Sequence, residues 1–158
     1  MKRIIGGALI IALLTMPVQA KSIQHTRVYD FNIPVEITYD EAQDLLKIAA
    51  AEGGNQGVYG QLLIMIVIMN RVSSSEFPNS ISEVIRQDGQ FESVTNGMFN
   101  VAEPTADTHL ALAELEKGKL EYRDIDYIGF ETTENHGALS KYFEFAETVG
   151  DHDFYRFK

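Results

Sequence analysis

The chain of 158 residues contains no cysteine and no tryptophan. Without cysteine it has no disulfide bonds, no thiolate ligands for a metal and no thiol that could carry a lipid anchor. Its four histidines form neither an H-x-x-x-H nor an HExxH arrangement, and no Gly-x-Ser-x-Gly occurs. These absences argue against cysteine, zinc and serine hydrolases, and we expect neither a metal nor a cofactor.

An excess of positive charge is also lacking. Asp and Glu number 23 against 13 Lys and Arg, which gives a formal net charge of −10. A surface that binds nucleic acid needs Lys and Arg to neutralise phosphates, so we expect no nucleic-acid partner. Acidity does not argue against a carbohydrate, which is recognised by hydrogen bonds and stacking.

Long apolar runs are confined to the N-terminus. Lys2 and Arg3 precede an apolar stretch over residues 4–16, and the small residue Ala20 follows shortly after. This is the pattern of a signal peptide over residues 1–20, and we expect export to the periplasm, the cell wall or the medium. The alternative is an uncleaved membrane anchor, but the stretch is shorter than the roughly 20 residues that span a bilayer.

The rest of the chain has the length of one domain. Residues 21–37 are expected to form an N-terminal arm or edge strand, and residues 38–158 the domain itself. A capping box of Thr38 and Glu41 predicts the start of a helix that stops at Gly53. Residues 58–72 predict a second helix, apolar on every side at its centre and therefore buried in the middle of the domain.

The C-terminal half predicts shorter elements. We expect helices at 81–87 and 106–117, separated by a long ordered loop at 88–102. Alternating aromatic residues predict strands at 127–132 and 153–157, with a loop over 133–149 between them. The fold class is therefore α+β, a mainly helical core around a buried central helix with a small sheet of C-terminal strands.

Glu52 is the candidate catalytic residue. It lies seven residues after Leu45 and three after Ala49, which places its carboxylate on the apolar stripe of the first helix. Partial burial and the negative end of the helix dipole should both favour its protonated form. A carboxylic acid in that form can protonate the leaving oxygen of a glycosidic bond. A Glu in the last turn of a helix is also commonly a solvated surface residue.

Several short motifs follow one another in the order Leu45-Leu46, Ala51-Glu52-Gly53, Gly60-Gln61, Met69-Asn70-Arg71-Val72, Phe77-Pro78-Asn79-Ser80-Ile81, Val84-Ile85 and Gly89-Gln90-Phe91, and the chain closes with Gly150-Asp151-His152-Asp153-Phe154-Tyr155. In order and spacing over roughly residues 44–100, and in this closing segment, the chain resembles the SleB-type cell wall hydrolases. That family includes spore cortex-lytic enzymes and lytic transglycosylase-like catalytic domains.

The resemblance implies a lysozyme-like fold and cleavage of peptidoglycan glycan strands between N-acetylmuramic acid and N-acetylglucosamine, with the family's catalytic Glu at Glu52. It also implies a lytic transglycosylase outcome, in which one carboxyl group serves as acid and then as base and a 1,6-anhydro ring closes. A muramidase would instead use a second carboxylate, for which Asp88, Glu92 and Glu103 are candidates. A non-catalytic wall-binding protein is the remaining alternative.

Five further residues are candidates for substrate binding. Gln90 can hydrogen bond an acetamido group, and Phe91 can stack on a sugar or fill the core. Asn70 is either a substrate contact or a helix-end hydrogen bond. Tyr127 and Phe130 are expected to pack the sheet first and line the cleft second. The expected partner is peptidoglycan, with no stable membrane anchor; because an acidic domain gains little attraction from an anionic wall, a protein targeting partner is plausible.

Overall fold

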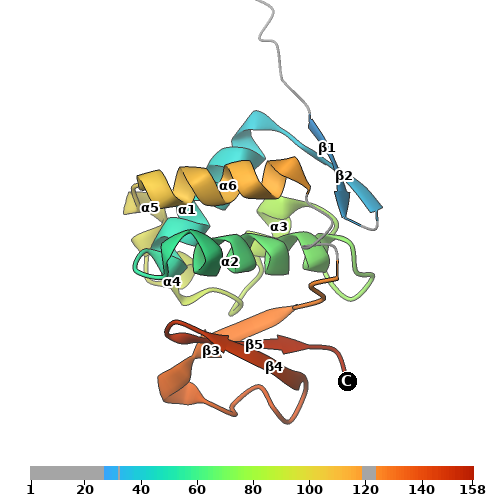
Figure 1. Cartoon of the computed structure of the whole chain (residues 1–158), viewed down its shortest axis with the longest axis vertical. Helices are drawn as coiled ribbons and strands as arrows, with labels where there is room; N and C mark the ends of the chain where they lie inside the picture. The colour runs from blue at the N-terminus through green and yellow to red at the C-terminus, as the bar shows by residue number, and fades with distance from the viewer. Residues whose placement is uncertain (1–26, 32, 119–123) are drawn as a thin grey trace, which may run out of the picture.

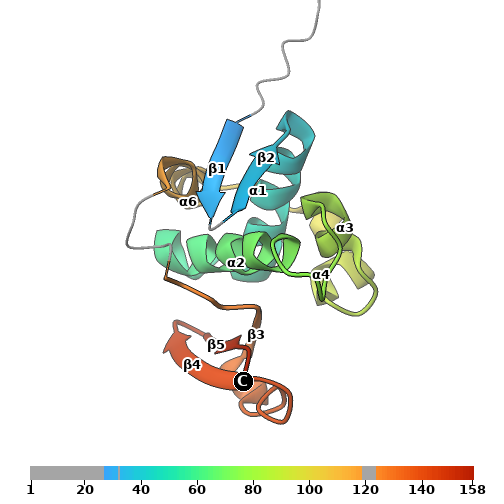
Figure 2. The ribbon, with the colours of Figure 1, turned by 90° about the vertical axis from the view of Figure 1, so that its right-hand side faces the viewer.

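The computed structural model describes residues 27–31, 33–118 and 124–158, with side chains from residue 37 onward. Helices make up one layer and a small C-terminal sheet lies against it, below helix α2 in Figure 1. A two-stranded hairpin, β1 (Arg27–Phe31) and β2 (Ile33–Ile37), lies at the opposite end of the molecule, as Figure 2 also shows. The expected α+β class is confirmed, and the predicted arm at residues 21–37 contains this hairpin. Residues 1–20, where the signal peptide is predicted, lie outside the described residues.

Helix α1 (Tyr39–Gly53) begins and ends where the sequence predicts. The Thr38 side chain accepts a hydrogen bond from the Glu41 N–H, and the Glu41 carboxylate accepts one from the Thr38 N–H, which completes the capping box. Leu45 and Ala49 are fully buried on the stripe that leads to Glu52. The capping box therefore fixes the first turn of the helix, and the apolar stripe fixes which face points inward.

Helix α2 (Gly57–Val72) forms the centre of the core. Residues 62–69 are at most 1% exposed, so every side of this stretch is covered by other parts of the domain. Helix α6 (Ala106–Lys117) and helix α1 pack on it from one side, and the C-terminal sheet covers another. The prediction of a buried central helix is confirmed.

Between these helices the chain is more regular than predicted. Helix α3 (Ile81–Arg86) lies where expected, but the predicted loop at 88–102 contains two single-turn helices, α4 (Glu92–Thr95) and α5 (Met98–Val101). Each is too short to produce a helical period in the sequence, and Gly97, with φ of 85°, breaks the chain between them. The loop prediction was wrong for these residues.

The C-terminal sheet has the strand order β3 (Gly129–Thr132), β5 (His152–Arg156), β4 (Glu144–Val149), and both pairs are antiparallel. Strand β4 falls in the segment 133–149 that was predicted to be a loop. It lies at an edge of the sheet and none of its residues is buried, so its sequence lacks the alternation that marks a half-buried strand. Strand β5 is central and β3 forms the other edge.

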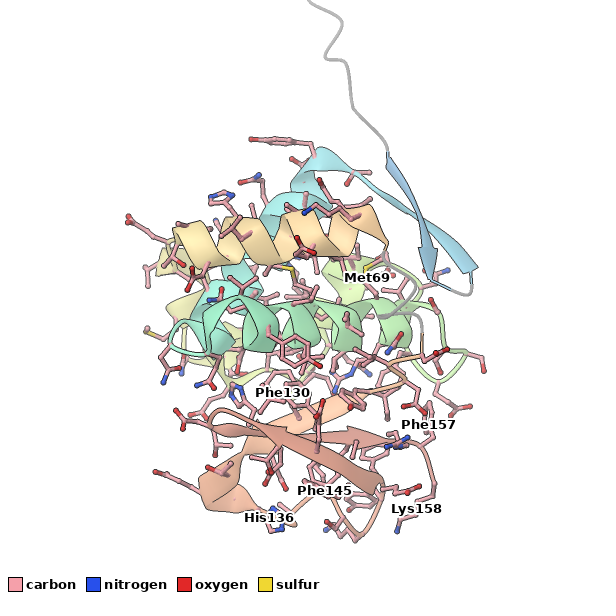
Figure 3. All side chains as sticks on the ribbon, viewed as in Figure 1. Met69, Phe130, His136, Phe145, Phe157 and Lys158 are labelled. Atoms are coloured by element: carbon pink, nitrogen blue, oxygen red, sulfur yellow. The ribbon has the colours of Figure 1, made fainter. Side chains whose placement is uncertain are left out.

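The two faces of the sheet have different surroundings. Phe130, His152 and Phe154 stack their rings at centroid distances of 5.1–6.2 Å on the face toward helix α2, and Figure 3 shows Phe130 between that helix and the sheet. Glu131 and Asp153 alternate with them and point to the other face, which the segment 133–143 covers. No helix among the described residues is both long enough and apolar enough to cross a membrane.

Candidate active site

Glu52 lines a hollow of about 410 Å³ between the end of helix α1 and the sheet. We call this hollow the Glu52 pocket. Its side chain is half-buried, and its Oε1 accepts a hydrogen bond of 3.1 Å from the backbone N–H of Ser93. The first turn of helix α4 thus fixes the position of the carboxylate. The other residues of the pocket lie at the α1–α2 junction and at the ends of β3 and β5: Asn55, Gln56, Thr132, Thr133, Glu134, Asp151 and His152.

A set of amide contacts joins the α1–α2 junction to the turn before β5. Asp151 Oδ2 accepts hydrogen bonds from Asn55 Nδ2 at 3.0 Å and Gln56 Nε2 at 3.1 Å, while Gln56 Oε1 accepts one from the Asp151 N–H at 2.8 Å. Gly150, with φ of 58°, makes room for this arrangement, because a Cβ there would stand 1.9 Å from Gln56 Oε1. These contacts fix the sheet relative to Glu52.

His152 supplies the buried wall of the pocket. It is 4% exposed, and its Nδ1 has no hydrogen-bond partner among the described residues. Burial lowers the pKa of His152 below its ordinary value of 6.5, and the negative charges of Glu52, Asp151 and Asp153 oppose this shift only in part. Near neutral pH the pocket therefore has a neutral imidazole beside Glu52.

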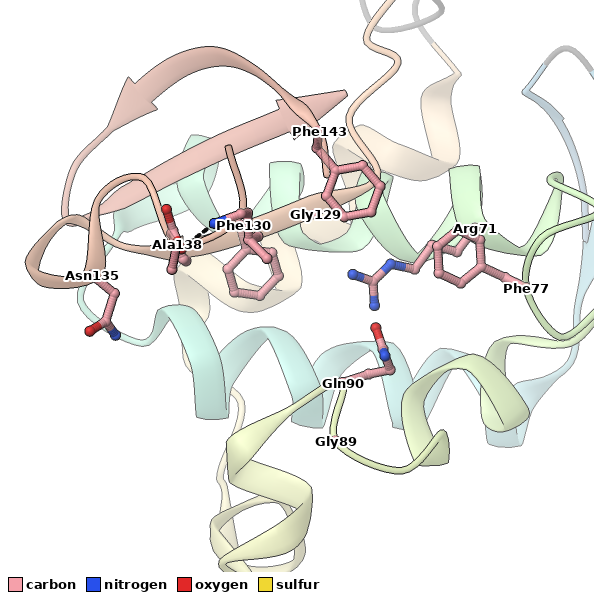
Figure 4. A pocket seen from close by; sticks show the side chains of 11 residues that line it. Arg71, Phe77, Gly89, Gln90, Gly129, Phe130, Asn135, Ala138 and Phe143 are labelled. Atoms are coloured by element: carbon pink, nitrogen blue, oxygen red, sulfur yellow. Dashed lines mark hydrogen bonds between the residues drawn. The ribbon is translucent and has the colours of Figure 1, made fainter. Parts of the chain in front are cut away.

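A second hollow of about 430 Å³, which we call the Arg71 pocket, lies along the free edge of β3. Two predicted substrate residues, Gln90 and Phe130, line it, together with Arg71 and Phe77. Figure 4 shows the Gln90 amide and the Arg71 guanidinium pointing toward one another. Phe91, by contrast, is 3% exposed and packs against Phe130 at 6.1 Å, so it fills the core beneath the pocket.

The structure places Asn70 and Tyr127 in structural contacts. Asn70 Nδ2 donates to the backbone carbonyls of Ile125 at 2.8 Å and Tyr127 at 2.9 Å, which ties helix α2 to the chain entering β3. The Tyr127 hydroxyl donates to Glu147 Oε1 at 2.9 Å across the sheet. Neither residue belongs to the described lining of the two pockets.

Replacement of Asn70 by Ala tests that arrangement. Two hydrogen bonds between α2 and the segment before β3 would be lost, and we expect the free energy of unfolding to fall by about 2 kcal/mol. Thermal melting followed by circular dichroism measures the loss, with Asn100→Ala on the exposed side of α5 as the matched control. A raised KM with unchanged melting would instead assign Asn70 to substrate binding.

Sequence reasoning missed several residues of the Glu52 pocket. Glu134 and Asp151 are the acidic residues that line it beside Glu52 among the described residues, whereas Asp88, Glu92 and Glu103 lie outside its lining. Glu134 lies in the segment predicted to be an undifferentiated loop, and no local motif marks it. Asp151 and His152 stand in the closing motif, which was the available signal. No group of three or more potential metal ligands occurs among the described residues.

The segment 133–143, which contributes to both pockets, is held on the outer face of the sheet by two carboxylates. Glu131 accepts hydrogen bonds from the N–H groups of Gly137 at 2.8 Å and Leu139 at 3.2 Å, and from the Tyr155 hydroxyl. Asp153, 1% exposed, accepts from His136 Nδ1 and Thr148 Oγ1, each at 2.5 Å. Both pockets therefore depend on Glu131 and Asp153 to hold one of their walls in place.

Two curated relatives, both spore cortex-lytic enzymes of Bacillus cereus, are 32% identical to the chain over 68 residues, which is 43% of this chain and 26% of theirs. The match thus spans about a quarter of the length of these relatives.

Two solved structures have a similar fold. The catalytic domain of the germination-specific lytic transglycosylase SleB from Bacillus anthracis aligns with a TM-score of 0.64 at 21% identity, covering 76% of this chain and 97% of that one. The catalytic domain of SleB from Bacillus cereus aligns at 0.60 and 22%, covering 74% and 91%. These likenesses confirm the expected SleB-type fold.

The cell wall hydrolase family model matches residues 55–155, which is more than half of the chain. The match includes the Arg71 pocket and the C-terminal sheet up to Tyr155, and it begins three residues after Glu52. Together with the sequence relatives and the fold, it shows that this chain belongs to the cell wall hydrolase family and has a SleB-type enzyme domain.

Proposed function

We propose that this domain cleaves the glycan strands of peptidoglycan between N-acetylmuramic acid and N-acetylglucosamine, with Glu52 as the catalytic acid. The observation that carries the proposal is the Glu52 pocket, in which a half-buried carboxyl group at the end of helix α1 faces an open hollow. Membership of the cell wall hydrolase family and the SleB-type fold support the same substrate class.

Glu52 is well placed for acid catalysis. The Ser93 N–H holds one carboxyl oxygen, so the other is free to approach the glycosidic oxygen. His152 is neutral near pH 7, so it adds no positive charge to the pocket beside Glu52. The first step requires a protonated carboxyl group at this position.

The transglycosylase route needs only this one carboxyl group. Protonated Glu52 gives its proton to the oxygen of the breaking bond, and the N-acetylglucosamine side leaves as an alcohol. The resulting carboxylate then takes the proton from the C6 hydroxyl of the muramic acid residue, whose oxygen bonds to C1 and closes the 1,6-anhydro ring. Glu52 ends protonated, ready for the next cycle.

A hydrolytic muramidase is the second candidate, and Glu134 is the observation that favours it. Glu134 lines the same pocket, is exposed and lies across from Glu52 on the segment after β3. An inverting or retaining glycosidase uses such a second carboxylate to activate water or to attack the sugar. Asp151 is less suited, because one of its oxygens already accepts hydrogen bonds from Asn55 and Gln56.

Mass spectrometry of the products separates the two routes. For the transglycosylase we expect 1,6-anhydro-muramic ends from purified peptidoglycan, and Glu134→Gln should keep at least a third of the wild-type rate. Reducing muramic ends that carry one added water, together with a loss of about 100-fold or more in Glu134→Gln, would assign the muramidase route instead. Absence of both products would overturn the proposed function.

Export remains part of the proposal. The signal-peptide pattern in residues 1–20 and a substrate in the cell wall both call for transport across the membrane. The acidic composition favours a separate protein that brings the enzyme to the wall. Fractionation of cells and sequencing of the mature N-terminus test the first point, with cleavage expected after Ala20.

A further inference from the structure

The Arg71 pocket contains a buried cation that forms no ion pair with the carboxylates the structure describes. Arg71 is 7% exposed, and none of the described carboxylates lies within ion-pair distance of its guanidinium. Its Nε donates to the Ile128 carbonyl at 2.7 Å, which satisfies one of its five N–H groups. A charge removed from water in this way costs free energy unless a partner of opposite sign compensates for it.

The remaining donors of Arg71 indicate where such a partner would bind. Nη1 is enclosed and has no hydrogen-bond partner among the described residues, so Nη2 is the donor through which Arg71 lines the pocket. The rings of Phe77 and Phe91 lie 5.1 and 5.3 Å from the guanidinium carbon and hold it in place. Burial lowers the pKa of Arg71 to about 10, which still leaves it charged at neutral pH.

The opposite wall of the pocket is suited to a polar ligand. Gln90 is exposed and directs its amide toward the guanidinium, as Figure 4 shows. Gly129 lies close to the guanidinium, since a Cβ built there would be 3.9 Å from Arg71 Nη2. Glu131 also lines the pocket, but both of its oxygens accept hydrogen bonds from the segment 133–143 or from Tyr155.

The Arg71 pocket adjoins the Glu52 pocket. Strand β3 and the residues after it contribute to both: Thr132 and Glu134 to the Glu52 pocket, Glu131 and Asn135 to the Arg71 pocket. The Phe130 ring also packs at 5.1 Å from His152, which is a wall of the Glu52 pocket. A glycan held at Glu52 would therefore have its substituents within reach of the Arg71 pocket.

We propose that the Arg71 pocket binds a carboxylate carried by the muramic acid residue, through Arg71 Nη2 and the Gln90 amide. The carboxylate is either that of the lactyl group on a peptide-free residue or one belonging to an attached peptide. N-Acetylglucosamine carries neither, so this contact would distinguish the two sugars and set which bond faces Glu52. The inference rests on the proposed function, because it assigns the group that orients the same substrate.

Neutralised substrates test the proposal. Peptide-free glycan strands and peptide-bearing strands are each compared with the same strands after their carboxylates are converted to methylamides. We expect wild-type kcat/KM to be at least tenfold higher for the charged member of one pair, the ratio that one charge-assisted hydrogen bond produces. The pair that responds identifies the source: the lactyl group in the peptide-free pair, the peptide in the peptide-bearing pair.

Gln90→Glu is the informative variant, because Gln90 is exposed and its replacement does not disturb the core. A carboxylate at residue 90 would pair with Arg71, and we expect the preference for charged strands to fall below threefold. Gln43→Glu adds the same charge on helix α1, outside the lining of both pockets, and should keep the wild-type preference. Arg71→Lys keeps the charge without the planar fork, and its melting is measured first to show that it folds.

The outcomes are separable. If wild type cleaves charged and neutral strands at rates within twofold of each other in both pairs, the carboxylate site is wrong but the proposed glycan cleavage stands. An unchanged preference for charged strands in Gln90→Glu would lead to the same conclusion. If no strand is cleaved, the proposed function fails. The site is then tested by itself: the affinities for N-acetylmuramic acid and for N-acetylglucosamine are measured from NMR shifts of the Gln90 amide and compared. Equal affinity for the two sugars would then overturn it.

Discussion

Replacement of Glu52 by Gln is expected to lower the rate of glycan cleavage by about 10²–10⁴-fold, the contribution of a positioned general acid. Gln has the same shape, and its amide oxygen can still accept the hydrogen bond from the Ser93 N–H. It cannot donate a proton to the glycosidic oxygen. We therefore expect kcat to fall while melting temperature and affinity for glycan strands stay close to those of the wild type.

Release of soluble muropeptides from purified peptidoglycan measures this effect. Glu144→Gln, an exposed carboxylate on strand β4 outside both pockets, is the matched control and should retain wild-type activity. Wild-type rates in Glu52→Gln would remove Glu52 as the acid and leave the catalytic group to be sought elsewhere in the pocket. A parallel loss of melting temperature would mean that the substitution acts on folding instead.

Asp153→Ala is expected to lower both the stability of the fold and the affinity for substrate. Asp153 lies in the central strand of the sheet and accepts hydrogen bonds from His136 and Thr148. Loss of both should lower the free energy of unfolding by about 2 kcal/mol, or the melting temperature by roughly 6–8 °C. Because His136 anchors the segment 133–143 through Asp153, the walls of both pockets should loosen and KM should rise.

The loss should also depend on pH. Burial raises the pKa of Asp153, but the hydrogen bonds from Thr148 and His136 and the nearby histidine charges outweigh it, so its pKa lies below the ordinary 3.8. The ionised form stabilises the fold above about pH 4, and this contribution disappears as pH falls through the lowered pKa. The stability gap between wild type and Asp153→Ala should therefore be largest near neutral pH and shrink below about pH 4.

Urea unfolding at several pH values measures this gap. Asp126→Ala is the control, because Asp126 is an exposed carboxylate 3.6 Å from Arg156, and such surface pairs contribute little. A gap in Asp153→Ala that stays constant between pH 7 and pH 3 would contradict the assigned role of the ionised carboxylate. An equal loss of stability in Asp126→Ala would show that the hydrogen bonds of Asp153 contribute no more than an exposed ion pair does.

Local sequence signals predicted the helices well because those signals act within one turn. The capping box at Thr38 determines where α1 starts, and eight consecutive apolar residues can be buried only at the centre of a small domain. The same reasoning failed for α4, α5 and β4. Single-turn helices are too short for a period, and an exposed edge strand has no face whose burial its sequence must encode.

In the candidate site, too, some features could be predicted from local sequence and others depend on tertiary packing. The position of Glu52 on the buried stripe of α1 could be read from the spacing of Leu45 and Ala49, because helix geometry alone fixes that relation. That Ser93 holds its carboxylate, 41 residues further along, depends on how α4 packs against α1. The motif of Asn70 left open a substrate contact or a helix-end hydrogen bond, and the amide donates to the backbone carbonyls of residues 125 and 127.

The sequence by itself determined the helical core, the C-terminal strands β3 and β5 and the carboxyl group at the end of α1, because each follows from periodicity or a short motif. Only the tertiary structure decided which residues face Glu52. Glu134 and His152 are 82 and 100 residues away along the chain, and the antiparallel pairing of β3 with β5 brings them to one pocket. Such long-range pairing depends on the burial of a whole face of the sheet, which no local pattern records.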